Sequence, residues 1–230
     1  MINSVYVYGD SILRGTILDS SKKTYYSMKE NIAQKLQEKF NICVNNKAKF
    51  GRTILKGARE IKAMLRKNEE CDLVVLEYGG NDCDHRWCEV SINPEGEHIP
   101  NTPIDIFEKV YNEIISEIKS KGIQVAVTSL PPIDSERYFN WVTQNGLNKD
   151  NVLMWLKDKQ TIAHYQELYS LTATKVALQN NCIYIDIRSE FLKQRDYREF
   201  MCEDGIHPNE KGQQLIEETI SKYLNSHIAI

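Results

Sequence analysis

Two short segments near opposite ends of the chain contain residue types that could do acid–base chemistry together. The first, GDS, places Ser11 directly after an apolar run, where we expect it to be exposed at a crevice as the chain enters a turn and then a helix. The second, DGIHP, places Asp204 three residues before His207. A carboxylate at that spacing can hydrogen-bond the imidazole and fix its tautomer, which leaves the other ring nitrogen free to act as a base. Each segment also has a simpler interpretation, because GDS is a good turn and helix N-cap sequence and His207 could be a surface histidine.

Two further segments could supply hydrogen-bond donors to a negatively charged oxygen. Gly51, in AKFGRTI, could offer its backbone N–H to a small anion because it has no side chain to crowd the approach. Asn81, in GGND, could project an amide NH₂ that stabilises developing negative charge on an oxygen. Both segments are also competent turns, so neither is specific by itself.

The composition is that of an ordinary globular protein with a real core. Hydrophobic residues make up 41% and charged residues 27% of the 230 residues. The net charge of −3 argues against a general affinity for nucleic acid, and no apolar run approaches the ~20 residues of a membrane span. A small-molecule substrate is therefore the expected partner. The sequence carries no signal for an oligomeric state.

The cysteines and the N-terminus favour a cytoplasmic protein. Six cysteines are scattered over the chain without a dense framework, which is typical of free thiols in a reducing compartment. The chain enters a strand almost at once, without the basic and apolar regions of a secretory signal. We therefore expect a cytoplasmic location.

Strand-type and helix-type patterns alternate along the chain. Apolar runs typical of strands lie at residues 5–9, 41–46, 72–80, 123–132 and 182–187. Apolar residues at helical spacing lie at residues 28–40, 54–68, 103–122, 155–181 and 208–226. The run at 72–80 is the most apolar and is predicted to be central. This order predicts an α/β fold with a parallel sheet and helices on both faces, in one domain over residues 1–230.

Two connections, 82–103 and 131–154, are unusually long, and both follow the carboxyl end of a predicted strand. That edge of a parallel sheet holds the binding crevice, so we expect both to be active-site loops. They contain Trp87, Tyr138 and Trp141, which could form an aromatic wall for a sugar ring or an acyl chain. The simpler interpretation is that these aromatic residues pack the loops against the body.

In this order, the GDS, Gly51, GGND and DGIHP segments resemble the four sequence blocks of the SGNH (GDSL-type) hydrolase family. The spacing agrees, and the blocks span nearly the whole chain, which makes the combination far more specific than any one block. Two departures are Ile12, where the name-giving motif has Leu, and the absence of the Ser or Thr that often neighbours Gly51.

The resemblance implies roles for these residues and a fold. Ser11 would be the nucleophile, His207 the general base and Asp204 its orienting partner. The oxyanion hole would consist of the backbone N–H groups of Ser11 and Gly51 with the Asn81 side chain. The family fold is a flavodoxin-like, three-layer αβα sandwich of about five parallel strands. Its members hydrolyse esters or thioesters through an acyl-enzyme, without a metal or other cofactor.

Several alternatives remain open from the sequence. The chain has no long apolar stretch for a lipid tunnel, which favours a small acyl group such as an O-acetyl group on a carbohydrate. A lysophospholipase or thioesterase of the same family and a catalytically silent carbohydrate-binding relative are the competing hypotheses. A metal-dependent phosphoesterase would find suitable ligand types among five residues of these segments, namely Asp10, Asn81, Asp82, Asp84 and His207. A serine where a second ligand should follow the first strand argues against that hypothesis.

Overall fold

A parallel sheet forms the centre of the molecule in a computed structural model, which describes residues 2–67 and 69–227. The five strands follow the order β4-β1-β5-β6-β7. They are β1 (Ser4–Gly9), β4 (Cys43–Asn46), β5 (Leu73–Glu77), β6 (Gln124–Thr128) and β7 (Ile183–Ile185). All neighbouring strands are parallel, and β5 is central. The predicted α/β class with about five parallel strands in flavodoxin-like order is confirmed.

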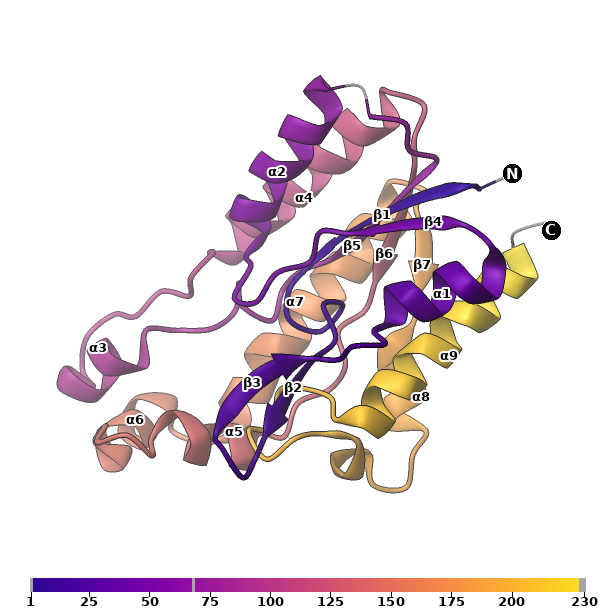
Figure 1. The fold of residues 1–230 in the computed structure, drawn as a ribbon. Helices are drawn as coiled ribbons and strands as arrows, with labels where there is room; N and C mark the ends of the chain where they lie inside the picture. The colour runs from indigo at the N-terminus through magenta and orange to yellow at the C-terminus, as the bar shows by residue number, and fades with distance from the viewer. Residues whose placement is uncertain (1, 68, 228–230) are drawn as a thin grey trace.

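Helices cover both faces of this sheet, so the molecule has three layers (Figure 1). One face is covered by α2 (Ile54–Arg66), α4 (Ile104–Lys119) and α7 (Gln160–Gln179). The other is covered by α1 (Ile32–Phe40), α8 (Ile187–Leu192) and α9 (Glu210–His227).

Alternation along the strands separates the two apolar cores. In β1, Tyr6 and Tyr8 pack towards α2 and α4, whereas Val5 and Val7 pack towards α1 and α9. All residues of β5 are buried, as expected for a strand covered on both faces.

An antiparallel hairpin, β2 (Thr16–Asp19) with β3 (Thr24–Ser27), follows the first strand. The sequence analysis predicted no element there, and it expected the chain after Ser11 to enter a helix. That expectation is wrong, because the turn after Ser11 leads directly into β2. Helix α1 begins only at Ile32, since Asn31 and Gln34 form a capping box at its start.

Further differences lie in the second half of the chain. The predicted helix over 155–181 is two helices, α6 (Lys149–Leu156) and α7, separated at Lys157 by a positive φ of 66°. Helix α8 and the short 3₁₀ helix η1 (Tyr197–Phe200) were not predicted. Helix α9 begins at Glu210 rather than at residue 208.

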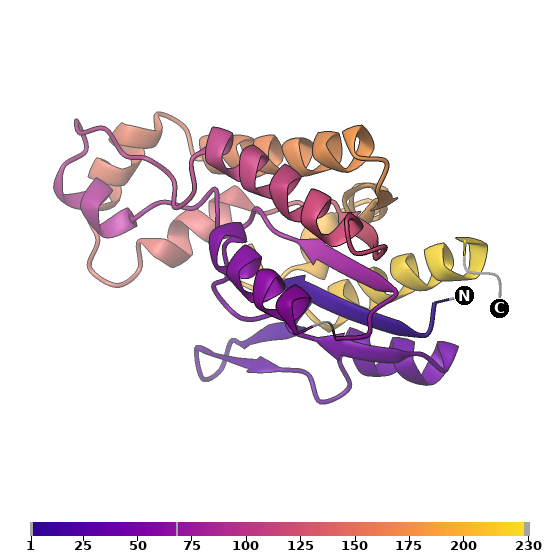
Figure 2. The same cartoon turned by 90° about the horizontal axis from the view of Figure 1, so that it is seen from above.

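The two long connections contain short helices rather than continuous loops. The first holds α3 (Trp87–Ile92), and the second holds α5 (Ser135–Val142) and the start of α6. Asp134 and Asn148 cap α5 and α6, each accepting two backbone N–H bonds, which explains helix formation in a segment predicted as loop. These helices lie beyond the carboxyl edge of the sheet, opposite the amino end of β1 (Figure 2).

None of the described helices combines the length and the apolar character that a membrane span requires.

Candidate active site

Strand order places the predicted site. Strand β1 lies between β4 and β5, so the order of the strands reverses at β1. The segments that follow β1 and β5 therefore meet at the carboxyl edge of the sheet, at this point of reversal. Ser11 follows β1 and Asn81 follows β5. His207 comes to the same edge on the segment before α9.

Ser11, His207 and Asp204 form a continuous hydrogen-bonded chain. The Nε2 atom of His207 lies 2.9 Å from the Oγ atom of Ser11, and its Nδ1 atom lies 2.6 Å from Oδ2 of Asp204. An ionised carboxylate can only accept, so Nδ1 carries a proton and Nε2 accepts from the serine hydroxyl. The arrangement allows His207 to remove the Ser11 proton.

The Asp204 carboxylate is held ionised by its hydrogen bonds. Burial acts to raise its pKa, but the hydrogen bonds from the His207 ring and from the backbone of Ile206 and His207 outweigh burial, and the pKa lies below its ordinary value. The backbone N–H groups of Ile206 and His207 also donate to Oδ1, each at 3.1 Å. These bonds fix the carboxylate in the position that orients the imidazole.

Ser11 lines a pocket and is only 5% exposed, so the expectation of an exposed serine is wrong. Side chains from distant segments line the same pocket. Tyr25 and Phe50 both pack on the His207 ring, with centroids 4.8 and 5.7 Å away.

The backbone N–H groups of Ser11 and Gly51, which are predicted for the oxyanion hole, make no hydrogen bond with any described residue. Gly51 has a positive φ of 68°, and no atom lies within 4 Å of an added Cβ, so the backbone conformation rather than crowding favours glycine there. Phe50, the preceding residue, lines the pocket.

Asn81 lines the pocket, and its amide is oriented by a carboxyl group that the sequence analysis did not weigh for this role. Its Nδ2 donates to Oδ2 of Asp10 at 2.8 Å. An amide NH₂ carries two hydrogens, so one is left for an oxyanion. Asp10 also accepts from the backbone N–H of Ile12 at 2.9 Å, which shapes the turn that presents Ser11.

Asp10 is itself held by Glu77, a fully buried residue at the end of β5. Oε2 of Glu77 accepts from the backbone N–H of Asp10 at 3.2 Å, whereas Oε1 has no hydrogen-bond partner among the described residues. Burial, followed by the charge of Asp10, raises the pKa of Glu77 well above its usual value. Burial therefore favours the uncharged form of the Glu77 carboxyl group.

Asp82 connects the segments that carry Gly51 and Asn81. Its carboxylate accepts from the backbone N–H of Ile54, the first residue of α2, at 3.0 and 3.2 Å. Thr53 gives that helix no side-chain cap, so Asp82 replaces it. The carboxylate thus ties the segment after β5 to the turn that contains Gly51.

Tyr25, on the unpredicted hairpin, is a site residue that the sequence analysis missed. Its hydroxyl donates to Oδ2 of Asp204 at 3.0 Å. No local motif marks it, because the hairpin contacts Asp204 only in the folded molecule.

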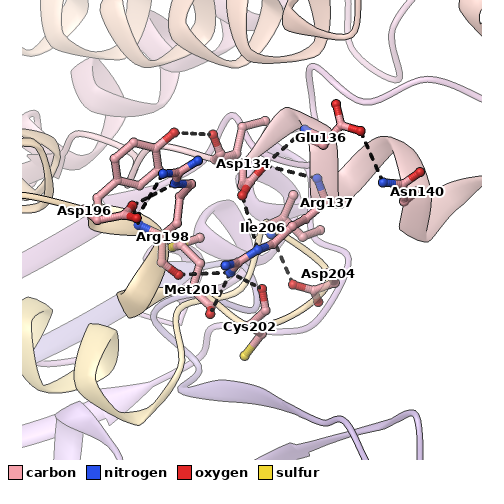
Figure 3. Close-up of polar contacts among 12 residues, drawn as sticks. Asp134, Glu136, Arg137, Asn140, Asp196, Arg198, Met201, Cys202, Asp204 and Ile206 are labelled. Atoms are coloured by element: carbon pink, nitrogen blue, oxygen red, sulfur yellow. Dashed lines mark hydrogen bonds and ion pairs between the residues drawn. The ribbon is translucent and has the colours of Figure 1, made fainter.

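Helix α5 holds the segment that carries Asp204 and His207 (Figure 3). One guanidinium nitrogen of Arg137 lies 2.9–3.5 Å from three carbonyl oxygens, those of Arg198, Met201 and Cys202. The backbone N–H of Asp134 donates to the carbonyl of Gly205 at 2.8 Å. The sequence analysis assigned no role to Arg137 or Asp134.

The pocket has a volume of about 310 Å³ and extends from Ser11 to the helices beyond the sheet. The three predicted substrate-binding residues, Trp87, Tyr138 and Trp141, all line it. Trp87 and Tyr138 also belong to an apolar cluster that packs α3, α5 and α6 together, so the packing interpretation applies to these two residues. Their contact with substrate stays a prediction.

Within the described residues, no three His, Cys, Asp or Glu side chains are grouped as metal ligands would be. Instead, Asp10 and Asp82 accept backbone N–H groups that shape the site.

A model of the GDSL-like lipase/acylhydrolase family matches residues 7–215. No curated protein matches the chain in sequence.

Many solved structures share the fold. A lipase/acylhydrolase from Enterococcus faecalis is 18% identical, with a TM-score of 0.68 over 98% of this chain and 96% of that one. The α/β hydrolase enzyme LAE5 from the metagenome of Lake Arreo is 15% identical, with a TM-score of 0.66 over 99% and 97%. Esterase EstA from Pseudoalteromonas sp., in a structure inhibited by monoethylphosphonate, is 18% identical, with a TM-score of 0.60 over 97% and 99%.

Proposed function

Because this chain belongs to the GDSL-like lipase/acylhydrolase family and is a serine hydrolase acting on esters, we propose that Ser11, His207 and Asp204 are its catalytic triad. The observation that carries the proposal is the hydrogen-bonded chain from Ser11 Oγ through His207 to Asp204, at 2.9 and 2.6 Å. Residues 196 positions apart make the first of these bonds.

The proposed reaction proceeds in two halves. His207 takes the Ser11 proton at Nε2 while Oγ attacks the ester carbonyl, and the oxyanion receives hydrogen bonds from the N–H groups of Ser11 and Gly51 and from the Asn81 amide. The imidazolium then protonates the leaving alcohol, which leaves an acyl group on Ser11. A water molecule attacks this acyl-enzyme, His207 takes the water proton, and the acid departs as the proton returns to Ser11.

For the acyl and alcohol parts of the substrate, we propose only the class of ester. An O-acetyl group on a carbohydrate stays a prediction, and a lysophospholipid or thioester is its competitor. The pocket volume of about 310 Å³ is shared by the acyl and alcohol parts, so it is compatible with each of these substrates. Initial rates on p-nitrophenyl esters of increasing chain length, compared with acetylated sugars, would rank these substrates.

Replacement of the nucleophile tests the triad. We expect Ser11→Ala to abolish hydrolysis of p-nitrophenyl acetate while leaving the melting temperature close to that of the wild type, because only the hydroxyl is removed. An organophosphonate should label the wild type once, at Ser11, and should not label the variant. Unchanged turnover in Ser11→Ala, or labelling at another residue, would overturn the assignment.

A further inference from the structure

His85 is a buried polar side chain whose hydrogen-bonding capacity is unused. Its ring lines the pocket, and only 5% of the residue is exposed. In residues 2–67 and 69–227, neither ring nitrogen has a hydrogen-bond partner. The ring instead contacts the aromatic rings of Trp87, Trp155 and Tyr165, at centroid distances of 5.8, 4.9 and 5.1 Å. Because His85 lines the pocket and its ring nitrogens have no partner among the described residues, a ligand that fills the pocket can supply one.

The environment of His85 selects an uncharged partner. Burial, together with the nearby His98, lowers the pKa of the imidazole to about 4, so the ring is neutral at pH 7. A neutral imidazole has one donor and one acceptor nitrogen, which match a hydroxyl group. Burial raises the pKa of the adjacent Asp84 to about 6, so Asp84 is still ionised at pH 7 and would repel an anionic ligand.

The walls around His85 suit an aromatic ring. Trp87 is held by a hydrogen bond from its Nε1 to Asp84 at 2.9 Å, and it meets Tyr138 edge to face with centroids 6.3 Å apart. Tyr165 lines the same pocket. Aromatic rings prefer such edge and offset contacts with one another, and a cavity of about 150 Å³ is enough for benzene. The pocket, at about 310 Å³, can therefore hold a phenyl ring together with the ester group.

The reaction geometry assigns this region to the acyl part of the substrate. The leaving oxygen must face Nε2 of His207, so the alcohol part lies on the side of His207, where Tyr25 and Trp141 are in ring contact. Asn81 and His85 lie on the same segment after β5, and both line the pocket, so we assign the acyl part to the side of His85.

We propose that the inner pocket binds an uncharged aromatic acyl group that carries a hydroxyl, and that His85 hydrogen-bonds this hydroxyl. The protein would thus be an esterase for hydroxyaryl acyl groups. This inference rests on the proposed function, because it takes Ser11 and His207 as the reacting pair.

A pair of substrates that differ by one hydroxyl tests the proposal. The pair is methyl 3-(4-hydroxyphenyl)propanoate and methyl 3-phenylpropanoate, and the readout is the ratio of their kcat/KM values. We expect the wild type to prefer the hydroxylated ester roughly tenfold, the value of one buried hydrogen bond, and His85→Phe to reduce the ratio to about one. His85→Gln keeps a donor and an acceptor and should retain part of the preference. His164→Phe, at an exposed histidine of α7, is the matched control and should keep the full ratio.

The outcomes separate the two hypotheses. A wild type that hydrolyses both esters equally, or that hydrolyses p-nitrophenyl acetate but neither of them, overturns the proposal for the acyl pocket whether or not the variants fold. A tenfold ratio that persists in His85→Phe overturns the role of His85. Failure of the wild type to hydrolyse p-nitrophenyl acetate would instead contradict the proposed function.

Discussion

At the scale of single residues, some hydrogen bonds in the site hold side chains in place, and other donors are left for the proposed reaction. Asn81 gives one amide hydrogen to Asp10 and keeps the other for the proposed oxyanion. Asp204 receives donors from Tyr25, from His207 and from two backbone N–H groups. In both cases, a polar neighbour with no proposed catalytic role helps to orient a group that has one: Asp10 orients Asn81, and Tyr25 contacts Asp204.

The Asn81 amide should contribute mainly to the transition state. We expect Asn81→Ala to lower kcat on the order of 100-fold with little change in KM, because the hydrogen bond strengthens as charge develops on the carbonyl oxygen. Steady-state kinetics with p-nitrophenyl acetate would measure both constants. A rise in KM alone would mean that Asn81 only binds the ester.

The Tyr25 hydroxyl should make a smaller contribution through Asp204. Tyr25→Phe removes one of four donors to the carboxylate but keeps the ring contact with His207. We expect kcat to fall by roughly fivefold, the equivalent of one hydrogen bond of about 1 kcal/mol. Tyr165 lines the same pocket, and Tyr165→Phe is the control because it also removes one tyrosine hydroxyl. This variant should hydrolyse p-nitrophenyl acetate faster than Tyr25→Phe.

At the scale of elements, helix α5 carries out two tasks. Tyr138 and Trp141 on this helix line the pocket, while Arg137 and the Asp134 cap hold the segment that contains Asp204 and His207. A change at one end of α5 should therefore reach both the pocket and the triad. Figure 3 shows how closely the two segments approach.

Gly205 is the point of closest approach between these segments. A Cβ at this position would lie 2.5 Å from the carbonyl oxygen of Asp134, so a side chain would separate α5 from the triad segment. We expect Gly205→Ala to lower both kcat and the free energy of unfolding. Gly122→Ala is the matched control, because Gly122 has nearly the same φ, 77° against 76°, but no atom within 4 Å of an added Cβ.

The control isolates crowding from backbone strain. Both alanines should cost about 1 kcal/mol for the positive φ, measured by urea denaturation, and Gly205→Ala should cost more. Equal losses in the two variants, with activity retained in both, would remove the argument that α5 positions the triad.

At the scale of the whole molecule, buried acids at the sheet edge should give the stability a pH dependence. Burial raises the pKa of Glu77 well above its usual value and that of Asp82 to about 7. In the unfolded chain these groups ionise at lower pH. As the pH rises above about 4, the unfolded state therefore loses protons that the folded state keeps, and each group lowers the free energy of unfolding.

A neutral residue at position 77 should reduce this dependence. The Gln side chain of Glu77→Gln cannot ionise. The free energy of unfolding of the variant minus that of the wild type should therefore be larger at pH 8 than at pH 5. Urea denaturation at the two pH values would measure the difference. The same difference at both would show that Glu77 is not held neutral in the folded state.

Much of this molecule was predictable because its information is local. Apolar periodicity located the five sheet strands and most of the helices, and the β5 run was correctly predicted to be central. The family resemblance depended on four short segments and is confirmed by the match over residues 7–215. The roles of Ser11, His207, Asp204, Gly51 and Asn81 remain predictions for the experiments above.

The elements that were missed are short and are stabilised by contacts that no local pattern records. The β2–β3 hairpin has only four residues in each strand, and most of β3 is exposed. Helices α3, α5 and α6 are six to eight residues long, a length at which an isolated helix is marginal. The N-caps Asp134 and Asn148 favour α5 and α6 locally, and the packing of α3, α5 and α6 against one another adds the stability that such short helices lack.

The sequence alone determined which residue types are present and in which elements, because strand and helix periodicity follow from side chains a few positions apart. Tertiary structure alone decided which distant side chains meet. Three examples are the hydrogen bond from Tyr25 to Asp204, the contacts of Arg137 with the segment before α9, and the ring contact of His85 with Trp155. Each joins residues that approach only because separate elements pack together. Such contacts leave no periodic trace in the chain, since their energy arises only once the whole fold has brought the elements together.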